Sequence, residues 1–162
     1  LDCSLISDGG GAFIVTTLER ARELRARPIR LLGAGQAQSY YHMGHLAGGV
    51  GLPRDRKGEF NLTNTVQKVA AHDAFGEAGV THDDIDVAEI YDSFTIAALM
   101  QFEDLGFCKK GEGGAFVEGG RIELGGALPV NTHGGLLSYA HPGMPGGIFH
   151  LIEGRRSRWS PT

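Results

Sequence analysis

The stretch LPVNTHGGLLSYAHPGMPGG, residues 128–147, is the most informative part of the sequence. It holds two histidines, an asparagine, a tyrosine and five glycines, and the apolar run 148–152 follows it directly. Glycine lets the backbone turn sharply and approach a ligand closely, so this density favours a functional loop over plain turns. Pro145 then predicts the first turn of a helix, where its missing N–H costs nothing. We therefore expect a loop that carries polar side chains into a site and runs into a helix.

The residues before this loop predict strands that alternate with helices. Short apolar runs bounded by turn residues indicate strands, and apolar side chains spaced by four residues indicate helices. On these grounds we expect strands at 12–16, 29–32 and 87–90, and helices at about 17–26, 63–78 and 94–105. The alternation implies an α/β protein with a mixed sheet flanked by helices.

Capping residues set the expected helix ends. Thr16 and Glu19 have the spacing of a capping box, in which a hydroxyl and a carboxylate satisfy free backbone N–H groups. Asp92 or Ser93 is placed to cap the helix at 94–105. Gly79 is placed where a left-handed glycine ends a helix.

Tyr91 follows the expected strand 87–90 directly. In open α/β sheets, ligands bind at the carboxyl ends of the strands, which makes this tyrosine a candidate site residue. The alternative is a core tyrosine whose hydroxyl is satisfied by backbone. Both interpretations remain open at this point.

Composition excludes several classes of protein. A chain of 162 residues fits one domain, and its net charge of -4 argues against a dominant nucleic-acid surface. No apolar run approaches the length that spans a membrane. Two cysteines are too few for a disulfide framework, which predicts a cytoplasmic location.

Two segments resemble cofactor-binding patterns, and neither predicts a site. His42 and His45 are spaced for one helix face, but no third ligand follows at a recognised spacing, so no metal site is expected. The segment GAGQAQ, residues 33–38, lacks the third glycine of a dinucleotide fingerprint. Residues 36–60 show neither helix nor strand period, and we interpret them as an excursion around a site or a partner contact.

Three motifs and the helix after them resemble, in order, the C-terminal part of the thiolase superfamily. The branch with the strongest resemblance contains sterol-carrier-protein thiolases and bacterial lipid-transfer proteins, some called acetyl-CoA acetyltransferases. The motifs are DCSLISDGGGAFIVTT at 2–17, EIYDSFTIAALMQFEDLGFC at 89–108 and GGALPVNTHGGLLSYAHPG at 125–143. The resemblance implies a layered αβαβα enzyme of two similar halves. Residues 1–27 would end the N-terminal half, 28–153 would form the C-terminal domain, and 154–162 would be an irregular tail.

The resemblance also implies site residues. His141 matches the histidine that acts as base, and Asn131 matches the asparagine of the water or oxyanion site around the thioester oxygen. The substrate would be a coenzyme A thioester of a lipid, and no permanently bound cofactor is expected. A histidine that only bonds its own turn is the alternative for His141. The neighbouring residues expected to bind substrate are His133, Gly134, Gly135, Ser138 and Gly143.

Departures from the family pattern leave three functions open. Neither Cys3 nor Cys108 lies in the family's nucleophile motif, so a thiolase reaction would need a cysteine from another segment. Tyr91 and Tyr139 match two tyrosines of lipid-transfer aldolases, in which a retro-aldol cleavage needs an acid and a base but no cysteine. The third possibility is an inert lipid or acyl-CoA binding module.

Partners are also implied by the resemblance. A homo-oligomer is the minimal expectation, because a half-domain leaves apolar faces that need cover. The alternatives are a hetero-oligomer with the missing thiolase half, or with a small protein that combines a zinc ribbon and an oligosaccharide-binding fold.

Overall fold

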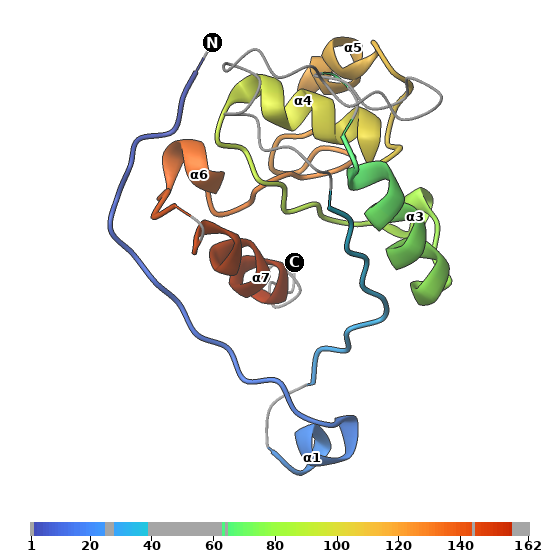
Figure 1. Ribbon diagram of the computed structural model, residues 1–162, viewed down its shortest axis with the longest axis vertical. Coiled ribbons are helices and arrows are strands. Elements are labelled where there is room, and N and C mark those ends of the chain that lie inside the picture. Colours follow the sequence, from blue (N-terminus) through green and yellow to red (C-terminus); the bar gives the residue numbers. More distant parts are fainter. Residues whose placement is uncertain (1, 25–27, 39–62, 64, 144, 157–162) are drawn as a thin grey trace. The chain divides into compact units, whose positions relative to one another are not determined.

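The computed structural model describes residues 2–24, 28–38, 63, 65–143 and 145–156. These residues fall into two compact units. Unit 1 comprises 1–31, 83–98 and 117–162, and unit 2 comprises 32–82 and 99–116. In chain order (Figure 1), the elements are α1 (Leu18–Glu23), α3 (Gln67–Ala78), η1 (His82–Asp84), α4 (Thr95–Asp104), α5 (Gly113–Val117), η2 (Glu118–Gly120), α6 (Gly135–Ser138) and α7 (Gly146–Arg156).

Three of the predicted helices are confirmed with small changes at their ends. The predictions at 63–78 and 94–105 correspond to α3 and α4, and the helix expected after Pro145 is α7. Gly79 ends α3 in the left-handed conformation at φ 67°, and its N–H bonds to the Phe75 carbonyl, as expected of a glycine cap. Helix α7 continues to Arg156, so residues 154–156 of the predicted irregular tail are helical. The rest of that tail lies outside the described residues.

Helix α1 begins one residue later than the capping pattern predicts. Thr17, rather than Thr16, is the N-cap, and its Oγ1 accepts a hydrogen bond from the Arg20 backbone N–H at 3.3 Å. The helix ends at Glu23 because Leu24 is already extended. It is therefore shorter than the predicted helix to residue 26.

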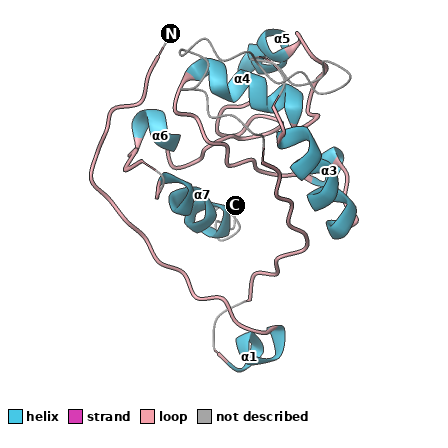
Figure 2. Ribbon diagram, viewed as in Figure 1, coloured by secondary structure: helices cyan, strands magenta, loops and turns pink. Residues whose placement is uncertain are grey.

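The predicted strands at 12–16, 29–32 and 87–90 are wrong as regular strands. Figure 2 shows no strand in the described part of the chain, and only isolated bridges occur there. A strand needs the N–H and C=O groups of a neighbouring strand, whereas Ile14 and Val15 are 90% and 80% exposed. Only the third segment makes a bridge, in parallel from Ala88 to Val130. The mixed sheet is thus not met among the described residues, where the regular elements are helices.

The core of unit 1 positions the candidate site. Its buried apolar side chains come from the segment before Tyr91, from the loop 121–134 and from helices α6 and α7, which contact each other. Because these elements share one core, the loop between α6 and α7 is held at both ends. The core residues are Ala88, Ile90, Leu128, Leu136 and Phe149.

Unit 2 has a separate aromatic core. Phe102 is 1% exposed and packs on Phe116 with ring centroids 5.3 Å apart. His82 bonds the Leu105 carbonyl at 2.8 Å and packs against Phe75 at 4.5 Å. Only the first three residues of the segment 36–60 are described, and His42 and His45 lie outside the described residues.

No helix in the described part of the chain is long and apolar enough to cross a membrane.

Candidate acid–base site

Three side chains of unit 1 form a continuous chain of contacts. The Tyr91 hydroxyl lies 2.7 Å from Nε2 of His141, and the Ser4 hydroxyl lies 2.6 Å from Nδ1 of the same ring. The tyrosine and histidine rings meet edge to face, with centroids 5.5 Å apart and an interplanar angle of 81°. Both ring nitrogens are thus engaged by hydroxyls, so a proton can pass between the phenol and the imidazole.

Backbone pairing below Tyr91 fixes the position of its ring. The Ala88 N–H bonds to the Pro129 carbonyl at 3.0 Å, and the Asn131 N–H bonds to the Ala88 carbonyl at 3.0 Å. The Asn131 side chain then holds Ile90 on both sides, accepting from its N–H at 2.7 Å and donating to its carbonyl at 2.9 Å. Both polar atoms of the Asn131 amide are therefore hydrogen-bonded to the segment that carries Tyr91. Its part in an oxyanion or water site stays a prediction.

The N-terminal segment holds His141 from the other side. The Ser7 N–H bonds to the His141 carbonyl at 3.2 Å, and the Ser7 hydroxyl accepts from the His141 N–H at 2.8 Å. Ser4 is buried at 7% exposure, and its N–H bonds to the Ser93 carbonyl at 3.0 Å. Sequence reasoning missed Ser4 and Ser7 as site residues. Their only signal was the motif at 2–17, more than a hundred positions from the histidine.

Asp92 binds the first turn of α6. Its Oδ1 accepts from the Leu136 N–H at 2.6 Å. The capping of α4 by Asp92 or Ser93 stays a prediction. The carboxylate is 6% exposed and needs such a donor, which the first turn of α6 supplies. At Gly135, a Cβ would collide with Asp92 Oδ2 and come within 2.7 Å of Asn131 Nδ2. This residue is therefore glycine because the site packs against its α-carbon.

The other predicted residues lie around this chain of contacts. Tyr139 is 61% exposed, and its ring packs on His133 and Phe149 with centroids 5.4 Å from each. The Gly143 carbonyl lies 3.5 Å from the Tyr91 hydroxyl. Gly134 caps α6 at φ 105°, and Ser138 is the last residue of that helix. Substrate contact by these residues stays a prediction, as does proton transfer by Tyr139.

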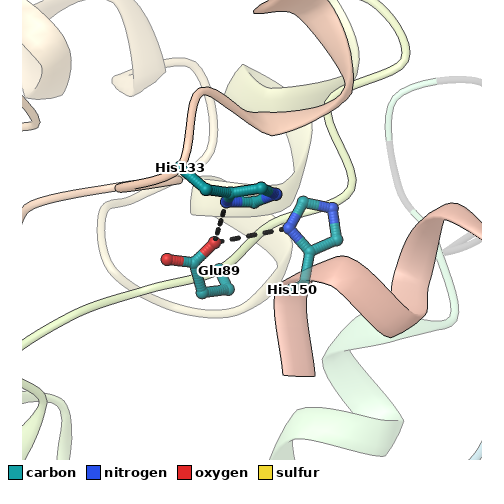
Figure 3. A group of neighbouring side chains, drawn as sticks. All are labelled: Glu89, His133 and His150. Carbon is teal, nitrogen blue, oxygen red and sulfur yellow. Dashed lines mark hydrogen bonds and ion pairs between the residues drawn. The ribbon is translucent and has the colours of Figure 1, made fainter. Parts of the chain in front are cut away.

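A second polar cluster lies in unit 1, and sequence reasoning missed it. Glu89 Oε2 lies 3.1 Å from His133 Nδ1 and 3.4 Å from His150 Nδ1 (Figure 3). The three side chains are 9%, 7% and 8% exposed. They come from the segment before Tyr91, from the glycine-rich loop and from α7, so no short sequence spacing links them. Substrate contact by His133 stays a prediction.

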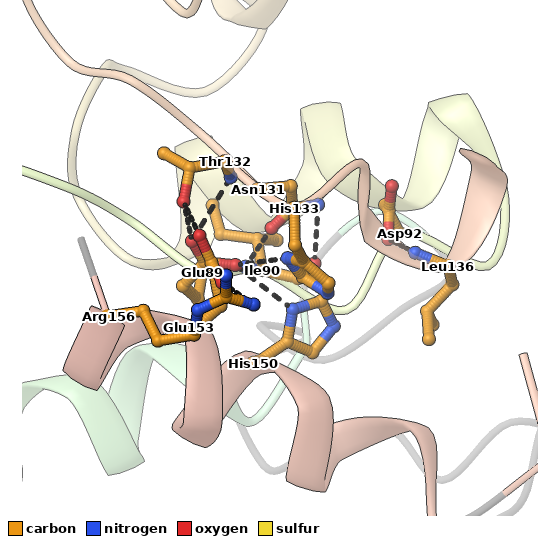
Figure 4. A network of polar contacts seen from close by, with 10 residues as sticks. All are labelled: Glu89, Ile90, Asp92, Asn131, Thr132, His133, Leu136, His150, Glu153 and Arg156. Atoms are coloured by element: carbon orange, nitrogen blue, oxygen red, sulfur yellow. Dashed lines mark hydrogen bonds and ion pairs between the residues drawn. The ribbon is translucent and has the colours of Figure 1, made fainter. Parts of the chain in front are cut away.

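Thr132 fixes the other oxygen of this carboxylate. Its N–H donates to Glu89 Oε1 at 3.1 Å, and its hydroxyl lies 3.0 Å from that atom and 2.9 Å from Glu153 Oε1 (Figure 4). Burial raises the pKa of Glu89, but the hydrogen bonds from His150 and Thr132 and the charge of His133 outweigh it, and the pKa is lowered from 4.5. Glu89 is therefore an anion in the folded chain.

Neither cysteine is placed as a nucleophile. Cys3 is exposed, and its thiol bonds to the Ser4 carbonyl at 3.4 Å. Cys108 belongs to unit 2, where burial raises the pKa of its thiol and the charges of Glu103 and Glu112 raise it further. A thiol that resists ionisation is a poor nucleophile.

Tyr91 and His141 are in direct contact and form a candidate acid–base pair. The chain belongs to the thiolase family, because residues 56–157, more than half of its length, match the thiolase C-terminal domain-like family. This confirms the resemblance noted in the sequence.

Relatives of this chain include both acyltransferases and carbon–carbon lyases. The chain is 39% identical to an acetyl-CoA acetyltransferase of Methanothermobacter thermautotrophicus, over 94% of this chain and 37% of that protein. It is 38% identical to the 17-hydroxy-3-oxo-4-pregnene-20-carboxyl-CoA lyase of Mycobacterium tuberculosis, over 87% of this chain and 34% of the lyase. Among solved structures, the Ltp2-ChsH2(DUF35) aldolase matches with a TM-score of 0.68 and 33% identity, over 84% of this chain and 34% of that chain. The chain thus spans about a third of the length of these relatives.

Proposed function

We propose that this chain supplies the acid–base pair of an enzyme that breaks or forms a carbon–carbon bond in a coenzyme A thioester of a lipid, by aldol chemistry. The observation that carries the proposal is the contact of the Tyr91 hydroxyl with Nε2 of His141 at 2.7 Å. In a thiolase mechanism this histidine would serve a cysteine. Here its Nε2 and Nδ1 both meet hydroxyls, and burial raises the pKa of the Cys108 thiol.

The retro-aldol direction uses one proton transfer at each end of the breaking bond. Tyr91 takes the proton of the substrate's β-hydroxyl while its own phenol proton passes to His141 Nε2. The bond between the carbinol carbon and the α-carbon breaks, and its electron pair becomes the enolate of the thioester. The hydroxyl oxygen becomes a ketone carbonyl. A proton then adds to the α-carbon, so the reaction needs no oxidant, reductant or covalent intermediate.

Two further residues have proposed roles in this reaction. Tyr139 would donate the proton to the α-carbon, since it is exposed and lies two positions from His141. Asn131 would contribute its remaining amide proton near the thioester oxygen, where negative charge develops. Ser4 is a positioning residue, because its hydroxyl meets Nδ1 and holds the ring with Nε2 toward the Tyr91 hydroxyl.

Two alternatives from the sequence have their own support. The first is acyl transfer by a thiolase whose nucleophilic cysteine lies outside this sequence, and the 39% identity to an acetyltransferase favours it. The second is an inert binding module. We also propose a hetero-oligomer with a DUF35 protein, because the name of the solved aldolase couples Ltp2 with such a protein.

The test is a lyase assay on the chain purified with the subunits that accompany it. The substrate is a β-hydroxyacyl-CoA with a tertiary hydroxyl, and the products are the ketone and the shortened thioester. We expect Tyr91→Phe to lower kcat by about 100-fold or more, since it removes the group that transfers the proton. His72→Gln is the matched control, because this side chain is 88% exposed and belongs to unit 2.

Cysteine alkylation separates the candidates. An aldolase keeps its activity after alkylation and loses it in Tyr91→Phe. Activity that disappears on alkylation and survives in Tyr91→Phe would establish the thiolase alternative. If no combination of subunits turns over the substrate but the chain still binds the thioester, the chain is an inert binding module.

A further inference from the structure

We propose that Glu89, His133 and His150 form a binding site for a divalent transition-metal cation such as Zn²⁺, a site separate from the acid–base pair. One ligand atom from each residue lies within 4.8 Å of the others. Two imidazoles and one carboxylate are a ligand set that zinc and iron(II) accept in proteins. The proposal does not depend on the aldol chemistry above.

The contact geometry favours a shared cation over direct pairing. His133 Nδ1 lies 3.1 Å from Glu89 Oε2 but lacks the orientation of a hydrogen bond. The contact of His150 Nδ1 with the same oxygen is long, at 3.4 Å. Ligands at about 2.0–2.2 Å from a tetrahedral zinc lie about 3.4 Å from each other, which is close to these separations. Figure 3 shows both imidazoles turned toward the same carboxylate oxygen.

The imidazoles also have unused bonding capacity. Both ring nitrogens of His133 and Nε2 of His150 are buried and have no hydrogen-bond partner among the described residues. Buried polar atoms are rarely left without a partner, so these three nitrogens are available to bind a ligand. A cation would take one lone pair from each ring.

The surroundings of Glu89 are those of a metal ligand. The N–H and the hydroxyl of Thr132 both contact Oε1 of Glu89. The other oxygen, Oε2, therefore faces the two histidines. Contacts of this kind orient ligating carboxylates. The anion Glu89 with two neutral imidazoles would carry a charge of −1, so a dication is partly neutralised inside the protein. The three protein ligands leave one position for water.

The experiment measures metal directly, without an activity assay. The full chain is saturated with Zn²⁺, dialysed against metal-free buffer and analysed for zinc by mass spectrometry. We expect one zinc per chain, with an X-ray absorption spectrum that contains two imidazoles and no sulfur. Zinc below one per ten chains, or a spectrum with a sulfur ligand, would overturn the proposal.

Variants identify the ligands. We expect His133→Asn and His150→Gln to abolish stoichiometric zinc. We expect Thr132→Val to weaken binding by about 10- to 100-fold, because it removes the hydroxyl that helps to orient the Glu89 carboxylate. His72→Ala and the double variant His42→Ala/His45→Ala are controls and should keep the zinc. Full zinc retention by both His133→Asn and His150→Gln would overturn the assignment. If a variant fails to fold, the absorption spectrum of the unmodified chain still decides.

Discussion

Replacing Gly135 by alanine should destabilise the chain far more than the same change at Gly143. Both glycines have left-handed backbones, at φ 65° and 71°. A new Cβ at Gly135 would collide with the Asp92 carboxylate and come within 2.7 Å of Asn131 Nδ2, whereas nothing lies within 4 Å of one at Gly143. The pair of variants therefore separates backbone strain from the collision.

The magnitude follows from these contacts. An alanine in the left-handed region costs roughly 1–2 kcal/mol, which both variants should show. At Gly135 the Asp92 carboxylate must also move away and loses its 2.6 Å hydrogen bond to the Leu136 N–H. A hydrogen bond to a charged group contributes about 1.5–3 kcal/mol. We expect a total loss of roughly 2.5–5 kcal/mol for Gly135→Ala.

The assay is unfolding in urea, followed by circular dichroism. The free energy of unfolding of each variant is compared with that of the unmodified chain. The comparison holds when the dependence of this free energy on urea concentration has the same slope in both. Equal losses of unfolding free energy in Gly135→Ala and Gly143→Ala would contradict this prediction, because the collision with Asp92 would then contribute nothing to the loss. Gly111→Ala, also at positive φ and with nothing within 4 Å, is a second control in unit 2.

Three further changes test the cores and the site. Leu136 is 1% exposed, so Leu136→Ala should lower the free energy of unfolding by about 2–5 kcal/mol in a urea titration. Leu151 is 62% exposed, and Leu151→Ala should lower it by less than about 1 kcal/mol. Similar losses in the two variants would contradict the assigned core. Burial raises the pKa of Glu103, but hydrogen bonds from the Gly113 N–H and Lys110 lower it below 4.5, so its stabilisation is present above pH 4.5 and is lost as the pH falls through the folded pKa. Lys110→Met should flatten this acid dependence in thermal melts, and an unchanged slope would argue against the ion pair. Ser4→Ala should lower kcat about 10-fold, equivalent to about 1.4 kcal/mol, with KM unchanged and recovery in Ser4→Thr; a change in KM alone would count against positioning.

The helices could be predicted because their signals are local. Gly79 and Pro145 mark the end of α3 and the start of α7 through backbone properties of single residues, and both predictions are confirmed. The strands could not be predicted in the same way. A strand forms only when a partner supplies its hydrogen bonds, and apolar runs such as 12–16 carry no information about that partner.

The same distinction between local signals and long-range contacts applies to the candidate site. The family could be predicted from the sequence, and with it the candidate residues His141, Asn131 and Tyr91, because these residues lie in short motifs. Their contacts could not be predicted, because they depend on the tertiary structure. It brought Ser4 onto Nδ1 of His141, turned the Asn131 amide onto the Ile90 backbone, and gathered Glu89 with two histidines from distant segments. Such contacts depend on how the chain folds back on itself, and no local spacing records them.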